Sequence, residues 1–334
     1  MQSVMIHRKS ECMPEVAPDP LASVVALLKP RPDISKMVVA GGRWQVERTD
    51  MASPFYAAIV DGCARLIVER QKPILLRAGD FVIVPELNSF TMTSEVPPPP
   101  SVARLPLETG PGMFRLGPPD SPVEMRALVG HCRFDAPDKA LLLSVLPQMI
   151  HVRGQDRLTA LVTMIYDETS AERPARAMIL DRLLEVLMIE ALRSGASPDL
   201  PPGLVRGLSD PRLGVALHRI HNAGDSSITV KGLAQEAGMS RSAFFERFRA
   251  TLGCAPMEYA IRWRMAVARD LLMRGQLTNA EIAHQVGYGS ASAFGMAFLR
   301  HEGMSPGLFA ERQAEARSGW GRRSGSRSTP SNRQ

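Results

Sequence analysis

The chain has 334 residues, of which 45% are hydrophobic and 22% charged, and its formal net charge is +6. This composition is typical of a globular protein, excludes a collagen-like or low-complexity chain, and the length suffices for two domains. Residues 1–20 carry three acidic residues and three prolines in place of an apolar signal core, and no run approaches the length of a membrane span. We therefore expect a cytoplasmic protein with no membrane partner.

The charge is unevenly distributed along the chain. Residues 201–334 contain 18 Lys or Arg against 10 Asp or Glu, whereas the first 200 residues carry a slight excess of acidic groups. A basic half of this kind is expected where a protein neutralises the phosphates of DNA.

The four cysteines are scattered through both halves, at positions 12, 63, 132 and 254. Their spacing fits neither a metal site nor a disulfide framework, so we expect free thiols. A redox-sensing thiol stays an alternative, although no neighbouring residue singles out one cysteine as a thiolate.

The N-terminal half begins with a segment that we expect to be disordered, residues 1–18, and continues with short elements. Residues 19–28 read as a short amphipathic helix, which the Lys29-Pro30-Arg31-Pro32 sequence ends. Short apolar or alternating runs separated by turn signals then predict strands at 44–46, 55–60, 63–68, 74–76, 80–84, 90–92 and 125–134. Many short strands at this spacing predict a β-barrel or a sandwich, with the proline run at 97–100 as an insertion.

Two helices are expected after the strands, at residues 158–169 and 174–193. The second has one apolar face, which would cover the barrel. Residues 194–203 are rich in residues that break both helices and strands, so they predict a linker between a first domain at 19–195 and a second at 204–315. The basic, low-complexity segment 318–334 is expected to be disordered.

One sequence pattern occurs twice between residues 228 and 309. Leu233, Ala234, Ala237 and Gly238 recur 49 positions later as Ile282, Ala283, Val286 and Gly287, while Phe244, Phe248, Gly253, Pro256 and Tyr259 recur 50 positions later as Phe294, Phe298, Gly303, Pro306 and Phe309. One residue is therefore inserted after the glycine of the second copy. Two copies are too few for a solenoid, so the repeat predicts a pair of small domains.

Each copy has the physical marks of a helix-turn-helix. An alanine on the first helix lets a second helix cross close over it, and the glycine supplies the sharp turn. Ser240 and Ser290 stand where a hydroxyl caps the second helix, and paired phenylalanines at i and i+4 bury one side of that helix. The opposite side stays free to enter a major groove of double-stranded DNA.

The segment 211–312 resembles the DNA-binding domain of the AraC/XylS family of bacterial transcription regulators. The resemblance is carried by both copies, in particular by Gly287-Tyr288-Gly289-Ser290-Ala291-Ser292-Ala293-Phe294 and Gly303-Met304-Ser305-Pro306. It implies an all-α unit of about seven helices, in which a long helix, here residues 256–272, joins two helix-turn-helix subdomains. It also implies RNA polymerase as a partner and a homodimer that packs through the 174–193 helix, as an alternative to that helix simply covering the barrel.

The resemblance also implies which residues contact DNA. These are Arg241, Ser242, Phe245, Glu246, Arg247 and Arg249 in the first copy, and Ser290, Ala291, Ser292, Met296 and Arg300 in the second. A glutamate can accept a hydrogen bond from cytosine N4, and a phenylalanine can touch a thymine methyl group. Met296 departs from the family, which often has arginine there, so we expect sequence specificity to come mainly from the first copy.

Residues 55–62 and 75–85 resemble the cupin-like sensor domain that precedes the DNA-binding domain in one branch of this family, with Gly79-Asp80 as a tight turn. The resemblance implies a jelly-roll barrel with covering helices, and therefore an α+β fold overall. Metal-binding cupins place histidines near Tyr56 and Phe90, and the aromatic residues found there argue against a metal site. We expect no cofactor and no catalytic residue, and we interpret His131 as a partly buried strand residue.

Three classes of function stay open at this point. The first is a transcription regulator with a small-molecule effector in the barrel, for which the candidate lining residues are Trp44, Phe55, Tyr56, Phe81 and Phe90. The second is a constitutive DNA-binding protein in which the barrel is a dimerisation scaffold and these aromatic residues are plain core. The third is a cupin enzyme fused to a DNA anchor, against which the lack of clustered His, Asp or Glu argues.

Overall fold

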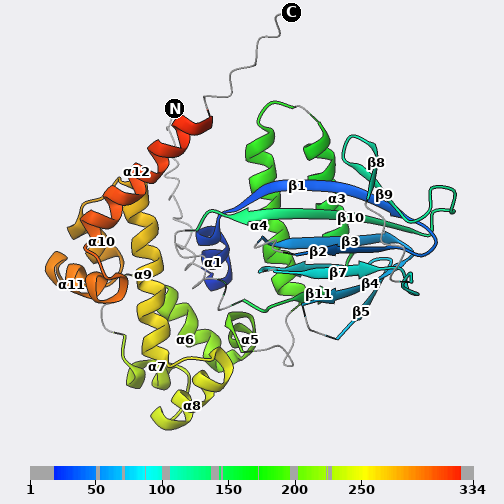
Figure 1. Ribbon diagram of the computed structural model, residues 1–334. Helices are drawn as coiled ribbons and strands as arrows, with labels where there is room; N and C mark the ends of the chain where they lie inside the picture. The colour runs from blue at the N-terminus through cyan, green and yellow to red at the C-terminus, as the bar shows by residue number, and fades with distance from the viewer. Residues whose placement is uncertain are drawn as a thin grey trace, which may run out of the picture.

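The computed structural model describes residues 19–49, 53–69, 72–86, 88–99, 106–136, 143, 146–171, 173–195, 202–222, 224 and 228–324. Within these residues a β-rich unit is followed by an all-helical unit, which confirms the α+β class (Figure 1). The expectations for residues 1–18, for most of the linker and for residues 325–334 lie outside the described residues.

Two sheets form the β-rich unit. The larger has seven strands in the order β11-β6-β3-β10-β1-β9-β8, and the smaller has four in the order β2-β7-β4-β5. Their bounds are β1 (Pro30–Ala40), β2 (Gln45–Arg48), β3 (Phe55–Asp61), β4 (Cys63–Val68), β5 (Ile74–Arg77), β6 (Phe81–Val84), β7 (Phe90–Thr93), β8 (Leu107–Gly110), β9 (Met113–Leu116), β10 (Met125–Phe134) and β11 (Ile150–Val152). The strands expected from sequence are confirmed, whereas β1, β8, β9 and β11 were not anticipated.

The two sheets pack face to face around an apolar core. Phe55 of β3 stacks on Phe90 of β7 with 4.6 Å between ring centroids, so this contact joins the larger sheet to the smaller one. No hydrogen-bonded ladder links the sheets among the described strands. Closure of the expected jelly-roll barrel is therefore not detected among these strands, which form two packed sheets.

Strand β1 begins in the proline-rich sequence that we interpreted as a helix end. Pro30 and Pro32 pair with Phe134 and Cys132 of β10, and the pairing with β9 on the other side of β1 starts only at Met37. The prolines thus lie where β1 is an edge strand, and there a missing backbone donor disrupts no second ladder. Two prolines therefore end the helix and still permit a strand to start.

Helices α3 (Asp156–Ser170) and α4 (Arg176–Ser194) cover the outer face of the larger sheet, and they confirm the two helices expected there (Figure 1). The apolar side of α4 buries Leu180, Leu184 and Leu187 against this face. Because successive residues of a strand point to opposite faces, Tyr56 faces these helices while its neighbour Phe55 faces the smaller sheet.

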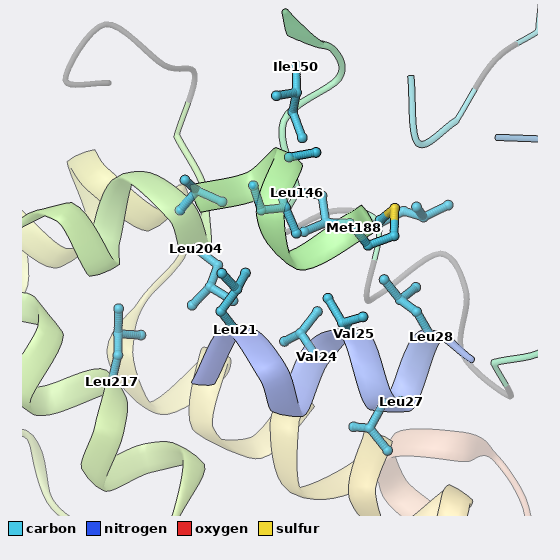
Figure 2. Packing of buried hydrophobic residues seen from close by; sticks show 14 of the residues in the cluster. Leu21, Val24, Val25, Leu27, Leu28, Leu146, Ile150, Met188, Leu204 and Leu217 are labelled. Carbon is cyan, nitrogen blue, oxygen red and sulfur yellow. The ribbon is translucent and has the colours of Figure 1, made fainter. Parts of the chain in front are cut away.

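Helix α1 (Pro20–Leu28) lies between the β-rich unit and the helical unit (Figure 1). Asp19 caps it, since its carboxylate accepts a hydrogen bond of 3.3 Å from the Leu21 amide. Figure 2 shows Val25 and Leu28 on the side of Met188 from α4, while Leu27 points the opposite way. All three α1 side chains are buried, so α1 contributes apolar contacts to both units.

The helical unit begins with α5 (Leu204–Ser209). From residue 211 onward the described chain forms the seven expected helices, namely α6 (Pro211–His221), α7 (Val230–Glu236), α8 (Arg241–Leu252), α9 (Pro256–Arg274), α10 (Asn279–Gln285), α11 (Ala291–Glu302) and α12 (Pro306–Ser324). Helix α12 continues past residue 318, into the segment for which we expected disorder.

The two helix-turn-helix copies belong to different hydrophobic cores. The first copy shares a continuous core with α1, α3, α4 and the outer face of the larger sheet. The second copy has a core of its own, built from the C-terminal half of α9, α10, α11 and α12. The boundary between the two cores therefore lies within α9, whose N-terminal half belongs to the first core and whose C-terminal half belongs to the second.

Candidate nucleic-acid interface

The turn and cap of each helix-turn-helix form as the sequence predicts. Gly238 and Gly287 have φ values of 63° and 78°. A Cβ atom at Gly238 would meet nothing within 4 Å, so there the backbone conformation and not the space requires glycine. The hydroxyls of Ser240 and Ser290 accept hydrogen bonds of 3.3 Å and 3.1 Å from the amides of residues 243 and 293, which fixes where α8 and α11 begin.

The repeat in the sequence is also a repeat in packing. In α8 the rings of Phe244 and Phe248 lie 5.6 Å apart, and the corresponding Phe294 and Phe298 of α11 are separated by the same distance. Each pair meets an edge-on ring from the next helix, at 5.9 Å for Tyr259 and 5.6 Å for Phe309. These contacts fix the rotation of α8 and α11, so that Glu246, Arg247 and Met296 face outward.

The residues expected to contact DNA lie together on the outer faces of α8 and α11. The exposed ones are Arg241, Ser242, Glu246, Arg247 and Arg249 on α8, Ala291, Ser292, Met296 and Arg300 on α11, and the cap residue Ser290. Phe245 is half-buried.

Arg247 is engaged within the protein. Its Nε atom lies 2.5 Å from Oδ2 of Asp210, which also caps α6 by accepting from the amides of Arg212 and Leu213. Burial would raise the pKa of Asp210, but the hydrogen bonds from Arg247 and from these amides hold that pKa below its ordinary value. Arg247 therefore ties α8 to α6 and leaves Arg241 and Arg249 as the cations of α8 best placed for phosphate contacts.

The outer face of α11 is less polar than that of α8. Met296 is 64% exposed and Leu299 is 50% exposed, and neither is a member of the core of this subdomain. A thioether and an isobutyl group have little hydrogen-bonding capacity toward base edges. The solvent-facing sides of α8 and α11 thus differ in polarity. That α8 supplies most of the sequence specificity stays a prediction.

A second candidate site, for a small molecule, lies between the two sheets. Phe55 and Phe90 line a cavity of about 50 Å³ there. Tyr56 and Phe81 belong to the core on the helix side, and Trp44 is buried between the sheets without lining this cavity. Two of the five expected effector residues are therefore brought together.

Sequence reasoning missed three basic residues of that cavity. Lys36, Arg48 and His131 line it together with the two phenylalanines. A signal for them was present, since each stands in a strand at the same alternation as apolar inward-facing residues. The signal for Lys36 could not be used because β1 itself was not predicted.

In two of the described cysteines the pKa is shifted in the direction that disfavours the thiolate. Burial raises the pKa of Cys63, and Glu95, whose carboxylate lies 3.7 Å from the sulfur, raises it further. Burial likewise raises the pKa of Cys254. No disulfide joins Cys63, Cys132 and Cys254. Within the described residues no group of three His, Cys, Asp or Glu side chains is arranged to hold a metal ion.

Comparison with known proteins agrees with this arrangement of two units. A family model described as Cupin matches residues 19–196, and one described as Helix-turn-helix domain matches residues 233–312. A putative AraC-like transcription regulator of Streptomyces lividans is 35% identical over 303 residues, which cover 86% of this chain and 97% of the relative. The chain belongs to the AraC family of transcription regulators.

Two further known proteins are similar to most of the chain or to its C-terminal part. The RCS-specific HTH-type transcriptional activator RclR of Escherichia coli (strain K12) is 25% identical over 304 residues, covering 88% of this chain and 98% of RclR. Among solved structures, the DNA-binding domain of AdpA in complex with a target DNA is 30% identical and covers 33% of this chain and 97% of that one, with a TM-score of 0.31.

Membership of the AraC family identifies the helical unit as the DNA-binding part of a transcription regulator. The relatives are regulators and not enzymes, in agreement with the expectation for this chain. Among the described residues no helix combines the length and the apolar character needed to cross a membrane.

Proposed function

We propose that this AraC-family regulator responds to a small molecule, which binds in its N-terminal domain (residues 19–195) and changes how its C-terminal domain (residues 204–315) presents α8 and α11 to promoter DNA in the cytoplasm. The observation that carries the proposal is the continuous core between the two domains. A ligand that alters the packing of the sheets has a route to the DNA-binding helices through α1.

An ion pair supports the coupling through α1. Nζ of Lys29, the residue that ends α1, lies 2.5 Å from Oδ1 of Asp270 on α9. Asp270 is buried and also pairs with Arg274 at 2.6 Å. A buried carboxylate requires its partners, so α1 and α9 have a defined relative position. Because α9 carries both helix-turn-helix subdomains, its position relative to α1 bears on both recognition helices.

The second part of the proposal is a division of labour between the two recognition helices. The face of α8 offers a carboxylate, a hydroxyl and two available arginines, which suit hydrogen bonds to base edges. The face of α11 offers mainly methyl and thioether groups beside Arg300, which suit positioning and contacts that follow DNA shape. In this proposal α8 supplies most of the sequence discrimination.

The third part is assembly. Helix α4 exposes Met178, Ile179 and Val186 at 63%, 40% and 40%, on the side opposite its buried leucines. We propose that this side packs against α4 of a second copy and that the dimer contacts RNA polymerase when bound at a promoter. Sedimentation of a Val186→Glu variant tests the dimer, with Val215→Glu as the control, because Val215 is an exposed valine (49%) on α6, which lies outside this interface. A variant that sediments like the wild type would exclude this interface.

The function is tested by selecting DNA sites from a random library with the full-length protein over a series of salt concentrations. We expect sites with two informative segments one helical turn apart, about 34 Å, and an affinity that falls steeply with salt. The selected site then reports on effectors. If no small molecule changes the affinity for this site, the constitutive alternative holds.

A further inference from the structure

Three basic residues stand at inward-facing positions of the two sheets. Lys36 alternates with Val38 and Ala40 along β1, Arg48 with Val46 along β2, and His131 with the apolar residues of β10 that face the same core. Inward positions of packed sheets are normally apolar, because burying a charge without a partner is costly. All three exceptions line one cavity.

The rest of the cavity is apolar. Its walls include the stacked pair Phe55 and Phe90 together with Met92, Phe114 and Leu116, and no Asp or Glu is among the described lining residues. The ammonium group of Lys36 lies 5.1 Å from the centroid of the Phe114 ring. No described carboxylate lies within ion-pair distance of Lys36 or Arg48. The cavity lining therefore contains basic groups and no carboxylate, while Asp33, whose charge acts on His131, lies outside this lining.

Burial and mutual repulsion disfavour the charged forms of the basic groups in the cavity. Burial lowers the pKa of Lys36, and the neighbouring charge of Arg48 lowers it further. Burial, followed by the charge of Lys36, lowers the pKa of His131 to about 4, so this imidazole is neutral at pH 7. His131 is 93% buried, being 7% exposed, and its Nδ1 atom has no hydrogen-bond partner among the described residues. An anion in the cavity would relieve the repulsion between the two cations.

We propose that the cavity binds a small organic acid with a single carboxylate, held between Lys36 and Arg48 within hydrogen-bonding reach of His131, and with its apolar body against Phe55 and Phe90. Guanidinium and ammonium groups both donate to carboxylates, and arginine does so with two parallel hydrogen bonds. A volume of about 50 Å³ admits roughly three to five water-sized groups, which indicates a short body. The proposal rests on the sensing role proposed above and names its class of ligand.

The test measures binding of straight-chain carboxylates, from acetate to hexanoate, to the full-length protein by calorimetry. Each acid is compared with its primary amide, which has nearly the same shape and no charge. We expect at least one acid to bind ten or more times more tightly than its amide. Lys36→Met and Arg48→Met should each bring this ratio close to one, while Arg126→Met, which removes an exposed cation from the strand of His131, should leave it unchanged.

Thermal unfolding of the ligand-free variants separates recognition from a structural role. If Lys36 serves the ligand, Lys36→Met removes a partly buried, unpaired charge and raises the midpoint of unfolding of the free protein. If Lys36 serves the fold, the same change lowers the midpoint. The second result overturns the proposal, as does equal binding of acids and amides or binding of neither.

The affinity for the selected DNA site, measured with and without each acid, distinguishes the two levels of the proposal. Acids that bind with the expected preference but leave DNA affinity unchanged support the ligand class and refute sensing by this domain. A neutral compound that changes DNA affinity, where no acid binds, supports sensing and refutes the ligand class.

Discussion

The separation of the two hydrophobic cores predicts that equivalent mutations in the two copies destabilise regions of different size. Phe248→Ala and Phe298→Ala each remove a fully buried ring that contacts two other aromatic rings. Loss of a buried phenylalanine typically lowers the free energy of unfolding by about 3–5 kcal/mol. The local damage is therefore nearly equal, and any difference in outcome must come from the surrounding core.

The surrounding cores differ greatly in size. Among the described residues Phe298 lies in a core of nine buried residues that is confined to the second subdomain. A small core of this kind rarely supplies more than about 3–5 kcal/mol, so Phe298→Ala removes most of the stability of this subdomain. Phe248 lies in the core shared with the N-terminal domain, so its loss lowers the stability of a much larger cooperative unit without unfolding it.

Hydrogen exchange measured by mass spectrometry on the full-length protein checks this prediction. In Phe298→Ala we expect fast exchange in residues 279–312 and nearly unchanged exchange in residues 230–252 and in α1. In Phe248→Ala we expect a moderate increase in residues 204–252 that extends to α1. Equal acceleration of both subdomains in Phe298→Ala would refute the reasoning, because it would mean that the two cores unfold together.

Three other predictions follow from single contacts. Asp270→Asn should lower the free energy of unfolding by about 1–3 kcal/mol, which is less than the loss of a fully buried ion pair because Lys29 and Arg274 are partly exposed. It should also speed hydrogen exchange in α1. Unchanged exchange in α1 would exclude this ion pair as a link between α1 and α9. Burial lowers the pKa of His221 to about 3 in the folded protein. The unfolded chain therefore binds a proton at this imidazole near pH 6.5, whereas the folded chain does so only near pH 3. Stability should therefore fall as the pH drops from about 6.5 toward 3, by up to about 1.4 kcal/mol per unit, and urea titrations of His221→Gln should give a flatter profile. In repeated site selection, Glu246→Ala should relax one base position by about 1–3 kcal/mol while Met296→Ala changes none; equal information loss in both would contradict the division of labour.

The DNA-binding unit was predictable from sequence because its signals are local. A turn glycine, a capping serine and two phenylalanines four positions apart specify each helix-turn-helix within about 20 residues, and the second copy supplied an independent check. The strands with alternating patterns were predictable for the same reason. What the sequence did not reveal was which strands pair and which sheet each belongs to.

The small-molecule cavity shows the consequence of that limit. Alternation alone indicates that Phe55 and Tyr56 point to opposite faces, so both could not line one cavity. It does not indicate which face meets the second sheet. That depends on contacts between β3 and β7, such as the one between Phe55 and Phe90, which are 35 positions apart in the sequence. Lys36 was missed because Pro30 and Pro32 concealed the start of β1, whose edge position at that point is a property of the assembled sheet.

The contact between α1 and α9 also has a consequence during translation, because α9 is synthesised long after α1. Lys29 and Asp270 are separated by 241 positions, so at about 5–20 residues per second α9 is made roughly 10 to 50 s after α1. In the later part of that interval α4 has been made and is available for the Val25 side of α1, but the Leu27 side has no α9 to cover it. A nascent chain shorter than about 256 residues therefore carries an uncovered apolar strip near its N-terminus. Chaperone contacts during translation should concentrate there and end once α9 has left the ribosome.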